Sequence, residues 1–225
     1  MRSVLLMSGG LDSAVILAGL SQFSEVTCLA VNYGQRHNLE LECAETLATH
    51  YEAKCIEMRI DMGFLRTPLL SNQRIEARTP EQIRKTRLSP MIVPARNSIL
   101  LSLGLALAEE IEAEDVLIGS TADDHAFPDC RPEFIEAFGQ VAKQGTVRKP
   151  KILAPLVKEF KAHVAREAVR MDIPIAKTCS CYQPRGFGIS GFVIHCGECD
   201  ACVMRRTAFT ECGLHDPTVY EKAGR

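Results

Sequence analysis

Short apolar runs alternate along this chain with longer segments in which apolar residues recur at helical spacing. The apolar runs have the length of buried strands and lie at 4–7, 26–31, 55–60, 116–118 and 152–153. The helical patterns cover 14–20, 38–50, 98–111, 132–143 and 158–171. Asn38 is placed as a helix cap and Pro132 near a first helical position. The alternation predicts an α/β fold with a doubly wound, mostly parallel sheet that is covered on both faces.

Composition narrows the class of protein without identifying it. The chain has 225 residues, of which 46% are hydrophobic and 24% charged, and its net charge is −2. These values are typical of a globular protein and indicate no general attraction to nucleic acid or to a membrane. No apolar run approaches the ~18 residues of a membrane span, and the run at 4–7 is too short for a signal-peptide core. We therefore expect a cytoplasmic protein whose ten cysteines stay reduced.

The most informative motif, Ser-Gly-Gly-Leu-Asp-Ser at 8–13, joins the first apolar run to a helical pattern. Adjacent glycines let the backbone approach an anion, and the start of a helix presents unpaired N–H groups to it. The serines add hydroxyl donors, and Asp12 can cap the helix or hold a Mg²⁺ that accompanies phosphates. An ordinary capped turn would explain a bare Gly-Gly pair, but the strand, the motif and the helix together disfavour it. Neither the Walker lysine nor a G-x-G-x-x-G pattern is present.

The loop resembles the PP-loop of the ATP pyrophosphatases, which split ATP into AMP and pyrophosphate. This resemblance implies the fold of the adenine nucleotide alpha hydrolases and a site for ATP with Mg²⁺. It does not specify the second substrate. The ATP-binding residues that it predicts are Met7, Ser8, Gly9, Gly10, Leu11, Asp12 and Ser13.

Four cysteines near the end of the chain, Cys181, Cys196, Cys199 and Cys202, follow a C-x14-C-x2-C-x2-C pattern. Four thiolates suit a tetrahedral structural Zn²⁺, although the spacing also resembles iron–sulfur ligation. Cys179 is an alternative fourth ligand. Scattered core cysteines are the less favoured explanation, because the three-residue spacing repeats. We expect an ATP-binding α/β domain over 1–177 and a zinc-binding segment over 178–225.

A segment at 61–90 has no clear strand pattern and an excess of basic residues. Long segments of this kind inside a compact domain are more often functional or disordered than decorative. We expect either a mobile lid over the phosphates or a surface insertion without a role. Its basic residues are Arg66, Arg74, Arg78, Arg84, Lys85 and Arg87.

Two further motifs lie next to predicted elements. One precedes the helix predicted at 98–111, and the other follows the strand predicted at 116–118. Val-Pro-Ala-Arg-Asn at 93–97 places Arg96 and Asn97 at the start of the buried helix, where an arginine can bind phosphate or carboxylate. Phe-Pro-Asp-Cys-Arg-Pro-Glu-Phe at 127–134 forms a stiff turn that can hold polar groups in a set geometry.

Taken with Tyr-Gly-Gln-Arg-His at 33–37, these motifs resemble, in order and over nearly the whole chain, the 7-cyano-7-deazaguanine synthases of the queuosine pathway. That family implies a homodimeric carbon–nitrogen ligase with one structural zinc per chain. It converts 7-carboxy-7-deazaguanine, ammonia and two ATP into the 7-cyano compound. Cys179 replaces a tryptophan usual in the family, and 120–126 also differ, which leaves open whether the product is nitrile or amide and whether it serves tRNA or DNA modification.

The resemblance also suggests roles for individual residues. Ser8, Asp12, Ser13, Arg96 and Lys161 are the expected catalytic residues, with the serines stabilising the departing pyrophosphate and the lysine neutralising charge on ATP. A pocket carboxylate should accept hydrogen bonds from the guanine-like edge of the substrate. The expected substrate-binding residues are Arg96, Asp129, Arg131 and Glu133.

Two rival functions use the same motifs. The stronger is a PP-loop tRNA thiolase whose cysteines hold an iron–sulfur cluster or carry sulfur, and whose basic segment touches tRNA. The weaker is a nucleotide-binding or zinc-ribbon module without catalysis. In the favoured interpretation the ammonia arrives free, because the chain has no room for a glutaminase domain, and no nucleic acid is bound directly.

Overall fold

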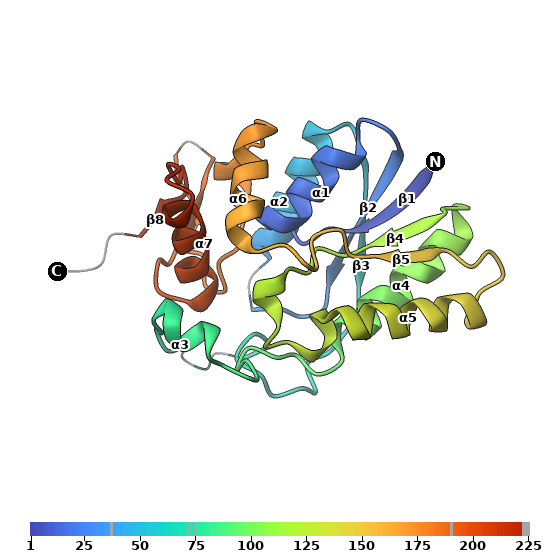
Figure 1. The fold of residues 1–225 in the computed structure, drawn as a ribbon, viewed down its shortest axis with the longest axis horizontal. Helices are drawn as coiled ribbons and strands as arrows, with labels where there is room; N and C mark the ends of the chain where they lie inside the picture. Colours follow the sequence, from blue (N-terminus) through green and yellow to red (C-terminus); the bar gives the residue numbers. More distant parts are fainter. Residues whose placement is uncertain (37, 72, 74, 190, 222–225) are drawn as a thin grey trace.

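Five parallel strands form the main sheet of the computed structural model, in the order β3-β2-β1-β4-β5 (Figure 1). They are β1 (Arg2–Leu6), β2 (Glu25–Asn32), β3 (Lys54–Arg59), β4 (Asp115–Leu117) and β5 (Lys151–Leu153). Every predicted strand is therefore confirmed. The chain adds β2 and β3 on one side of β1 and then β4 and β5 on the other side. The connections therefore switch direction between β1 and β4, and in parallel sheets a crevice opens beyond the carboxyl ends of the two strands at such a point.

The structure describes residues 1–36, 38–71, 73, 75–189 and 191–221. His37 of the 33–37 motif and Arg74 of the basic segment lie outside the described residues. Among the described residues, no helix has the length and apolar character needed to cross a membrane.

Helices cover both faces of the sheet, as the doubly wound prediction requires (Figure 1). Side chains alternate between the faces, so Leu5 packs with the helices of one face while Val4 packs with those of the other. Burying each such side chain contributes roughly 1.5–3 kcal/mol. The first face carries α1 (Leu11–Leu20), α2 (Leu39–His50) and α6 (Lys161–Arg170), and the second α4 (Arg96–Glu110) and α5 (Pro132–Gly145).

Two helix starts differ in detail from their prediction. Asn38 does occupy the N-cap of α2, but its side chain makes no capping hydrogen bond. The helix predicted from 158 begins at Lys161, whose backbone N–H donates to Oδ2 of Asp123 at 2.7 Å. Pro132 lies in the first turn of α5, as expected. Backbone N–H groups in the first turn have no partner within the helix, so a proline there costs no hydrogen bond.

The C-terminal part contains regular elements that the apolar patterning did not predict. Helix α7 (Asp200–Glu211) packs against α6, and its Ala208 and Phe209 join the core of the first face. Three short strands form a second sheet in the order β6-β7-β8. They are β6 (Gly186–Phe187), β7 (Val193–His195) and β8 (Val219–Tyr220). The domain boundary at 177 stays a prediction.

The segment at 61–90 contains one short helix, α3 (Pro80–Arg84), which lies beside α7 (Figure 1). Thr79 and Gln82 form a capping box at its start. No strand occurs in the described part of this segment. In the part of the chain that the structure describes, three 3₁₀ turns complete the fold, at η1 (Ala122–Asp124), η2 (Pro128–Cys130) and η3 (Ile175–Lys177).

Candidate active site and cysteine centre

The loop between β1 and α1 leaves the start of α1 open to an anion. Gly10 occupies the N-cap and no side chain caps the helix, so the first N–H groups have no partner within it. Gly9 has a φ of 70°. A Cβ at this position would overlap the carbonyl oxygen of Glu40 and stand 2.9 Å from the nitrogen of Ala44. Only glycine therefore fits between this loop and α2.

The two serines of the loop are held together. Oγ of Ser13 donates to the carbonyl oxygen of Gly10 at 3.0 Å and lies 3.2 Å from Oγ of Ser8. The N–H of Gly10 donates to Oγ of Ser8 at 3.3 Å. Hydroxyl and amide groups are thus gathered at the positive end of α1, as anion binding requires.

Asp12 forms an ion pair with Lys161, which lies 149 residues further along the chain. Their Oδ2 and Nζ atoms are 2.8 Å apart, and Nζ is also 3.6 Å from Oδ1 of Asp124. Asp124 is positioned by Thr121, whose N–H and hydroxyl both donate to its Oδ2. Burial opposes the charge on Lys161, but the two carboxylates outweigh it and raise the pKa of this lysine above its ordinary value.

The loop borders a cavity of about 300 Å³ beyond the carboxyl ends of β1 and β4. Gly119, which follows β4, packs so closely on α1 that a Cβ added at this position would lie 3.3 Å from the nitrogen of Ser13. The strand ends therefore meet the loop at the crevice that the topology predicts. Of the predicted site residues, the cavity is lined by Met7, Ser8, Gly10, Leu11, Asp12, Ser13, Arg96 and Lys161.

Arg96 reaches this cavity from the start of α4, opposite the loop. The preceding Ala95 has a φ of 55°, a conformation that turns the chain sharply into the helix. Asp129 holds the same helix start, because its Oδ2 accepts the N–H of Asn97 at 3.0 Å and its carbonyl oxygen accepts the Asn97 amide at 2.9 Å. The predicted placement of Arg96 and Asn97 at a helix start is confirmed.

The structure does not bring Asp129, Arg131 and Glu133 to the cavity wall. The Asp129 carboxylate caps α4. Nε of Arg131 donates to the carbonyl oxygen of His125 at 2.9 Å, and Glu133 lies exposed in the first turn of α5. The turn at 127–134 therefore positions the start of α4 through Asp129. Direct substrate contact by these three side chains stays a prediction.

Glu40 lines the cavity and was not predicted from the sequence. Its Oε1 accepts a hydrogen bond from Nε2 of Gln35 at 2.8 Å. Burial raises the pKa of Glu40 to about 7, against the opposing effects of Arg96 and Gln35. An acid in the first turn of a helix is a common capping feature, so nothing in the sequence distinguished Glu40 from Glu42 beside it.

The four predicted cysteines, Cys181, Cys196, Cys199 and Cys202, come together with all four sulfur atoms within 4.8 Å of one another. Sulfur–sulfur distances are 4.0 Å for Cys181 to Cys199, 3.9 Å for Cys196 to Cys202 and 3.5 Å for Cys199 to Cys202. All four side chains are buried. The group can hold a metal ion.

Backbone N–H groups point at these sulfur atoms. Gln183 and Cys196 donate to the sulfur of Cys181 at 3.2 and 3.3 Å. Tyr182 donates to the sulfur of Cys199 at 3.4 Å, and Cys199 donates to that of Cys196 at 3.4 Å. Such donors favour the thiolate form that binds metals.

Residues 179–182 join the cysteine group to the loop. The N–H of Cys179 donates to the carbonyl oxygen of Gly9 at 2.8 Å, and its thiol lies outside the group of four sulfur atoms. The N–H of Ser180 donates to Nε2 of His195 at 3.2 Å. Burial lowers the pKa of His195 to about 4, which keeps the ring neutral and able to accept. Cys179, Ser180 and Tyr182 all line the cavity.

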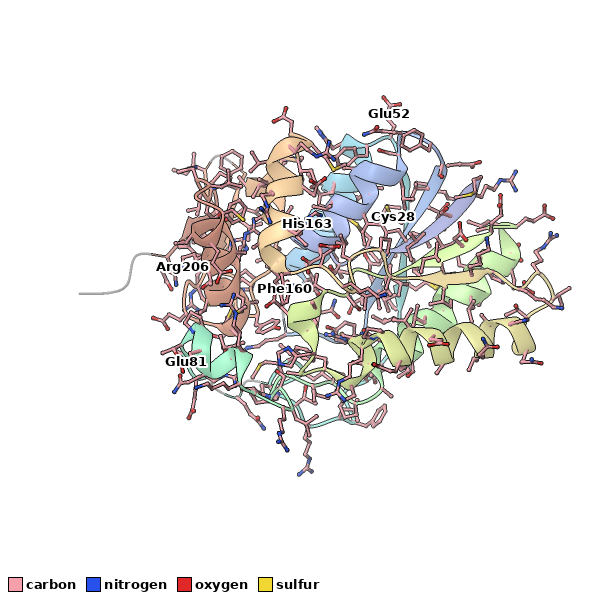
Figure 2. The ribbon with its side chains drawn as sticks, in the orientation of Figure 1. Cys28, Glu52, Glu81, Phe160, His163 and Arg206 are labelled. Atoms are coloured by element: carbon pink, nitrogen blue, oxygen red, sulfur yellow. The ribbon has the colours of Figure 1, made fainter. Side chains whose placement is uncertain are left out.

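Two arginines on α7 have different surroundings. Arg205 is buried, lines the cavity, and donates to Oγ of Ser180 at 2.9 Å and to the carbonyl oxygen of Ile175 at 3.0 Å. Arg206 (Figure 2) instead lies 4.8 Å from the centre of the Tyr220 ring. Only Arg205 of this pair is therefore placed to influence a ligand in the cavity.

The 61–90 segment contacts the cavity and the cysteine region together. Arg78 lines the cavity and pairs with Asp200, the first residue of α7, through both nitrogens of one edge of its guanidinium. Arg84 pairs with Glu211 at the other end of α7. This contact gives the segment a structural connection to the site, while its mobility stays a prediction.

Comparison with known proteins gives one consistent family. The model of the queuosine biosynthesis protein QueC matches residues 2–213. The chain is 40% identical to a 7-cyano-7-deazaguanine synthase of Anaeromyxobacter dehalogenans, over 98% of this chain and 96% of that protein. It is 37% identical to the synthase of Thermoplasma acidophilum, over 98% and 92%. A U34-tRNA thiolase structure from Methanococcus maripaludis is 16% identical with a TM-score of 0.48, covering 81% and 61%, which is too weak to bear on function.

Proposed function

This chain belongs to the family of the queuosine biosynthesis protein QueC, and we propose that it converts 7-carboxy-7-deazaguanine and ammonia into 7-cyano-7-deazaguanine at the expense of ATP. The observation that carries the proposal is the uncapped start of α1, with the Asp12–Lys161 ion pair beside it, in the cavity that Arg96 also lines. These groups supply anion binding, cation binding and carboxylate binding within one cavity.

The first step is activation of the substrate carboxylate. One of its oxygens attacks the α-phosphorus of ATP, and pyrophosphate departs with its electrons. The open N–H groups of α1 and the hydroxyls of Ser8 and Ser13 stabilise the charge on the departing group. Asp12 and Asp124 offer the oxygen ligands that Mg²⁺ prefers when it arrives with ATP, and Lys161 neutralises phosphate charge.

Nitrogen enters in the second step. Ammonia displaces AMP from the activated carboxylate and leaves an amide, whose oxygen is activated by a second ATP before elimination forms the nitrile. Arg96 is suited to hold the substrate carboxylate or a phosphate, because its guanidinium donates two parallel hydrogen bonds to such groups. Guanine-edge recognition by Asp129 or Glu133, with Arg131 on the carboxylate, stays a prediction, because these three side chains lie outside the cavity wall.

We assign zinc to the four cysteines. A tetrahedral ion with Zn–S bonds of about 2.3 Å requires sulfur atoms about 3.8 Å apart, and the observed separations of 3.5, 3.9 and 4.0 Å fit this spacing. A four-iron cluster would place each cysteine on a different iron and spread the sulfur atoms further. Bound zinc would hold the chain between Cys181 and Cys202 in place beside the cavity. A colourless protein with one zinc per chain would support this assignment over a thiolase cluster.

The remaining expectations concern assembly and location. As the family resemblance implies, we propose a homodimer, which light scattering of the purified protein would test. We also propose a cytoplasmic location, where thiols stay reduced and ammonia and ATP are at hand.

Mass spectrometry of the reaction products tests the function directly. The purified protein is mixed with 7-carboxy-7-deazaguanine, ATP, Mg²⁺ and ammonium. Nitrile and AMP together are expected, whereas amide alone would mean that the reaction stops after the first activation. Asp12→Ala should abolish product while fold and metal content stay unchanged, and unchanged turnover would refute the role of Asp12. If the wild-type protein forms neither product, the substrate assignment is wrong and tRNA thiolation is the next assay.

A further inference from the structure

We propose that the carboxylate of Glu40 accepts the protons that nitrogen must lose as the amide and then the nitrile are formed. The inference rests on the proposed function and adds to it a proton acceptor, which the loop, the ion pair and the cysteine group do not provide. It is based on the position of Glu40, on the pairing of the other cavity acids, and on the way one of its oxygen atoms is held.

Glu40 lies where the loop at 8–13 and α2 meet. Its backbone carbonyl oxygen packs directly on Gly9, so the first turn of α2 cannot move away from the loop without opening that contact. Its side chain lines the same cavity as Ser8, Gly10 and Arg96. A substrate carbonyl bound between the loop and Arg96 therefore shares its space with this carboxylate.

The other acids that line the cavity are already paired with cations. Asp12 and Asp124 are 2.8 and 3.6 Å from Nζ of Lys161, and Asp123 is 4.0 Å from Nε of Arg84. The remaining cavity acid, Asp200, pairs with Arg78. Protonation of any of these would break an ion pair.

Glu40 is different in this respect. Within the described part of the chain, no lysine or arginine nitrogen lies within ion-pair distance of its carboxylate. It can therefore accept a proton without losing an ion-pair partner there.

The Gln35 amide holds one oxygen of Glu40 in place. Nε2 of Gln35 donates to Oε1 of Glu40 at 2.8 Å and to the carbonyl oxygen of Val31 at 3.2 Å, while its own Oε1 accepts the N–H of Tyr33 at 2.7 Å. Two backbone groups thus determine the orientation of the amide. No donor among the described residues bonds to the second oxygen, Oε2, so this atom is the one that we assign to proton transfer.

Nitrogen loses two protons in each half of the reaction. An ammonium ion first gives a proton to Oε2, and the nitrogen lone pair forms the C–N bond while the carbon–oxygen bond to AMP breaks and AMP leaves with its electron pair. The nitrogen then carries three hydrogens and a positive charge, and it gives a second proton to Oε2 once the first has passed to water, which leaves the neutral amide. In the second half, adenylation of the amide oxygen makes the nitrogen cationic again, and one of its two protons passes to Oε2. The last N–H proton of the adenylated amide then follows it to Oε2. The N–H electron pair becomes the third carbon–nitrogen bond as the second AMP leaves. Each proton is then released to water.

The acidity of Glu40 agrees with this role. Burial raises its pKa to about 7, while Arg96 on α4 and Gln35 lower it. Tyr33 after β2 and Cys179 beside the loop also face it. A general base that titrates near neutral pH can both take up and release a proton in each cycle.

The test compares Glu40→Gln with wild type in two separate assays. The first is exchange of labelled pyrophosphate into ATP that depends on 7-carboxy-7-deazaguanine, which reports activation of the carboxylate without nitrogen. The second is product formation with ammonium or with hydroxylamine, a weaker base that is already neutral at neutral pH. We expect unchanged exchange, a loss of about 100-fold or more with ammonium, and a much smaller loss with hydroxylamine.

A matched control and a second variant keep the result interpretable. Glu42→Gln changes an exposed acid on the same helix and should leave both assays unchanged. Glu40→Ala removes the carboxylate, and added formate should restore part of its activity with ammonium. Thermal melting and metal content of each variant establish that the chain is folded.

The outcomes separate this inference from the proposed function. If Glu40→Gln loses pyrophosphate exchange, or if its product formation falls equally with ammonium and with hydroxylamine, Glu40 binds ATP or substrate and the proposal is wrong. Equal activity of Glu40→Gln and wild type with ammonium would overturn it as well. If the wild-type protein shows no exchange with 7-carboxy-7-deazaguanine, it is the proposed function that fails.

Discussion

The loop at 8–13 and the cysteine turn at 196–199 are built alike, but their backbone N–H groups differ in whether they have partners. Each contains a glycine with positive φ, which is 70° at Gly9 and 78° at Gly197. Each directs backbone N–H groups toward a place for an anion. In the loop this place is open, because no side chain caps α1. In the turn the N–H groups of Glu198 and Cys199 already bond to the sulfur of Cys196.

From this difference we infer that the loop exchanges its ligand and that the cysteine group serves as structural support. An uncapped helix start has unsatisfied donors, which a departing and returning phosphate can use. A buried group of four cysteine sulfur atoms can give a metal ion four ligands, which leaves no position open, as in structural metal sites. The hydrogen bond from the Cys179 N–H to the carbonyl oxygen of Gly9 connects the two regions, and we propose that the cysteine group supports the loop through it.

Loss of one metal ligand should have the largest effect of the changes considered. Cys199→Ser removes a sulfur that lies 3.5 Å from that of Cys202, and a structural metal contributes its binding free energy to folding. We expect metal content near zero, partial unfolding of 178–221, and loss of activity because residues 179–182 line the cavity. Metal analysis and circular dichroism measure this. Cys55→Ser, outside the group, is the control, and full activity of metal-free protein would show that the two regions are independent.

The next effect comes from the loop itself. Gly9→Ala places a Cβ against the backbone of Glu40 and Ala44 at a φ of 70°. Strain and overpacking together should cost about 2–4 kcal/mol of unfolding free energy, and displaced donors should lower kcat/KM on the order of 100-fold. Gly139→Ala, in α5 with open space around its Cβ, should instead gain about 0.5–1 kcal/mol. Similar behaviour of the two variants in urea denaturation would contradict the close approach.

Breaking the ion pair between Arg78 and Asp200, which joins the 61–90 segment to α7, should have an intermediate effect. Arg78→Met leaves Asp200 largely buried without its cation, at a cost of about 1–3 kcal/mol. Because Arg78 lines the cavity, we also expect a KM for ATP about tenfold higher and faster proteolysis within 61–90. Lys85→Met removes an exposed pair with Glu81 and should change stability by less than about 1 kcal/mol. An unchanged cleavage pattern in Arg78→Met would argue against a lid.

The last expected effect is on stability and depends on pH. Because the pKa of Glu40 rises from 4.5 to about 7 on folding, its contribution is fully present below pH 4.5 and is lost as the pH rises through 7. Glu40→Gln should therefore be more stable than wild type at pH 8, by about 1–3 kcal/mol, and equal to it near pH 4.5. Urea denaturation at both pH values measures this, with Glu42→Gln as the control. A pH-independent difference would show that Glu40 is not buried in its acid form.

Local patterns in the sequence predicted much of the fold. Each strand of the main sheet is a short apolar run, and the long helices have apolar residues on the face that packs against it, so that periodicity alone indicated both. Helix α7 was missed because buried Asp200 and Arg205 interrupt its apolar pattern. Strands β6, β7 and β8 have at most three residues, which is too few for a period of two to be visible.

The chain by itself determined the chemistry of two sites, because each is a short motif. The loop and the three closely spaced cysteines carry their donors within a few residues, so spacing alone indicated an anion and a metal. Tertiary structure decided which distant groups complete them. It paired Asp12 with Lys161, and it placed Cys181 rather than Cys179 with the other three sulfur atoms.

Tertiary structure also directed the Asp129 carboxylate to the start of α4 and enclosed Glu40 in the cavity. The physical reason is that burial, ion pairing and pKa depend on neighbours brought together by the fold, and those neighbours leave no mark in the local pattern of a single chain.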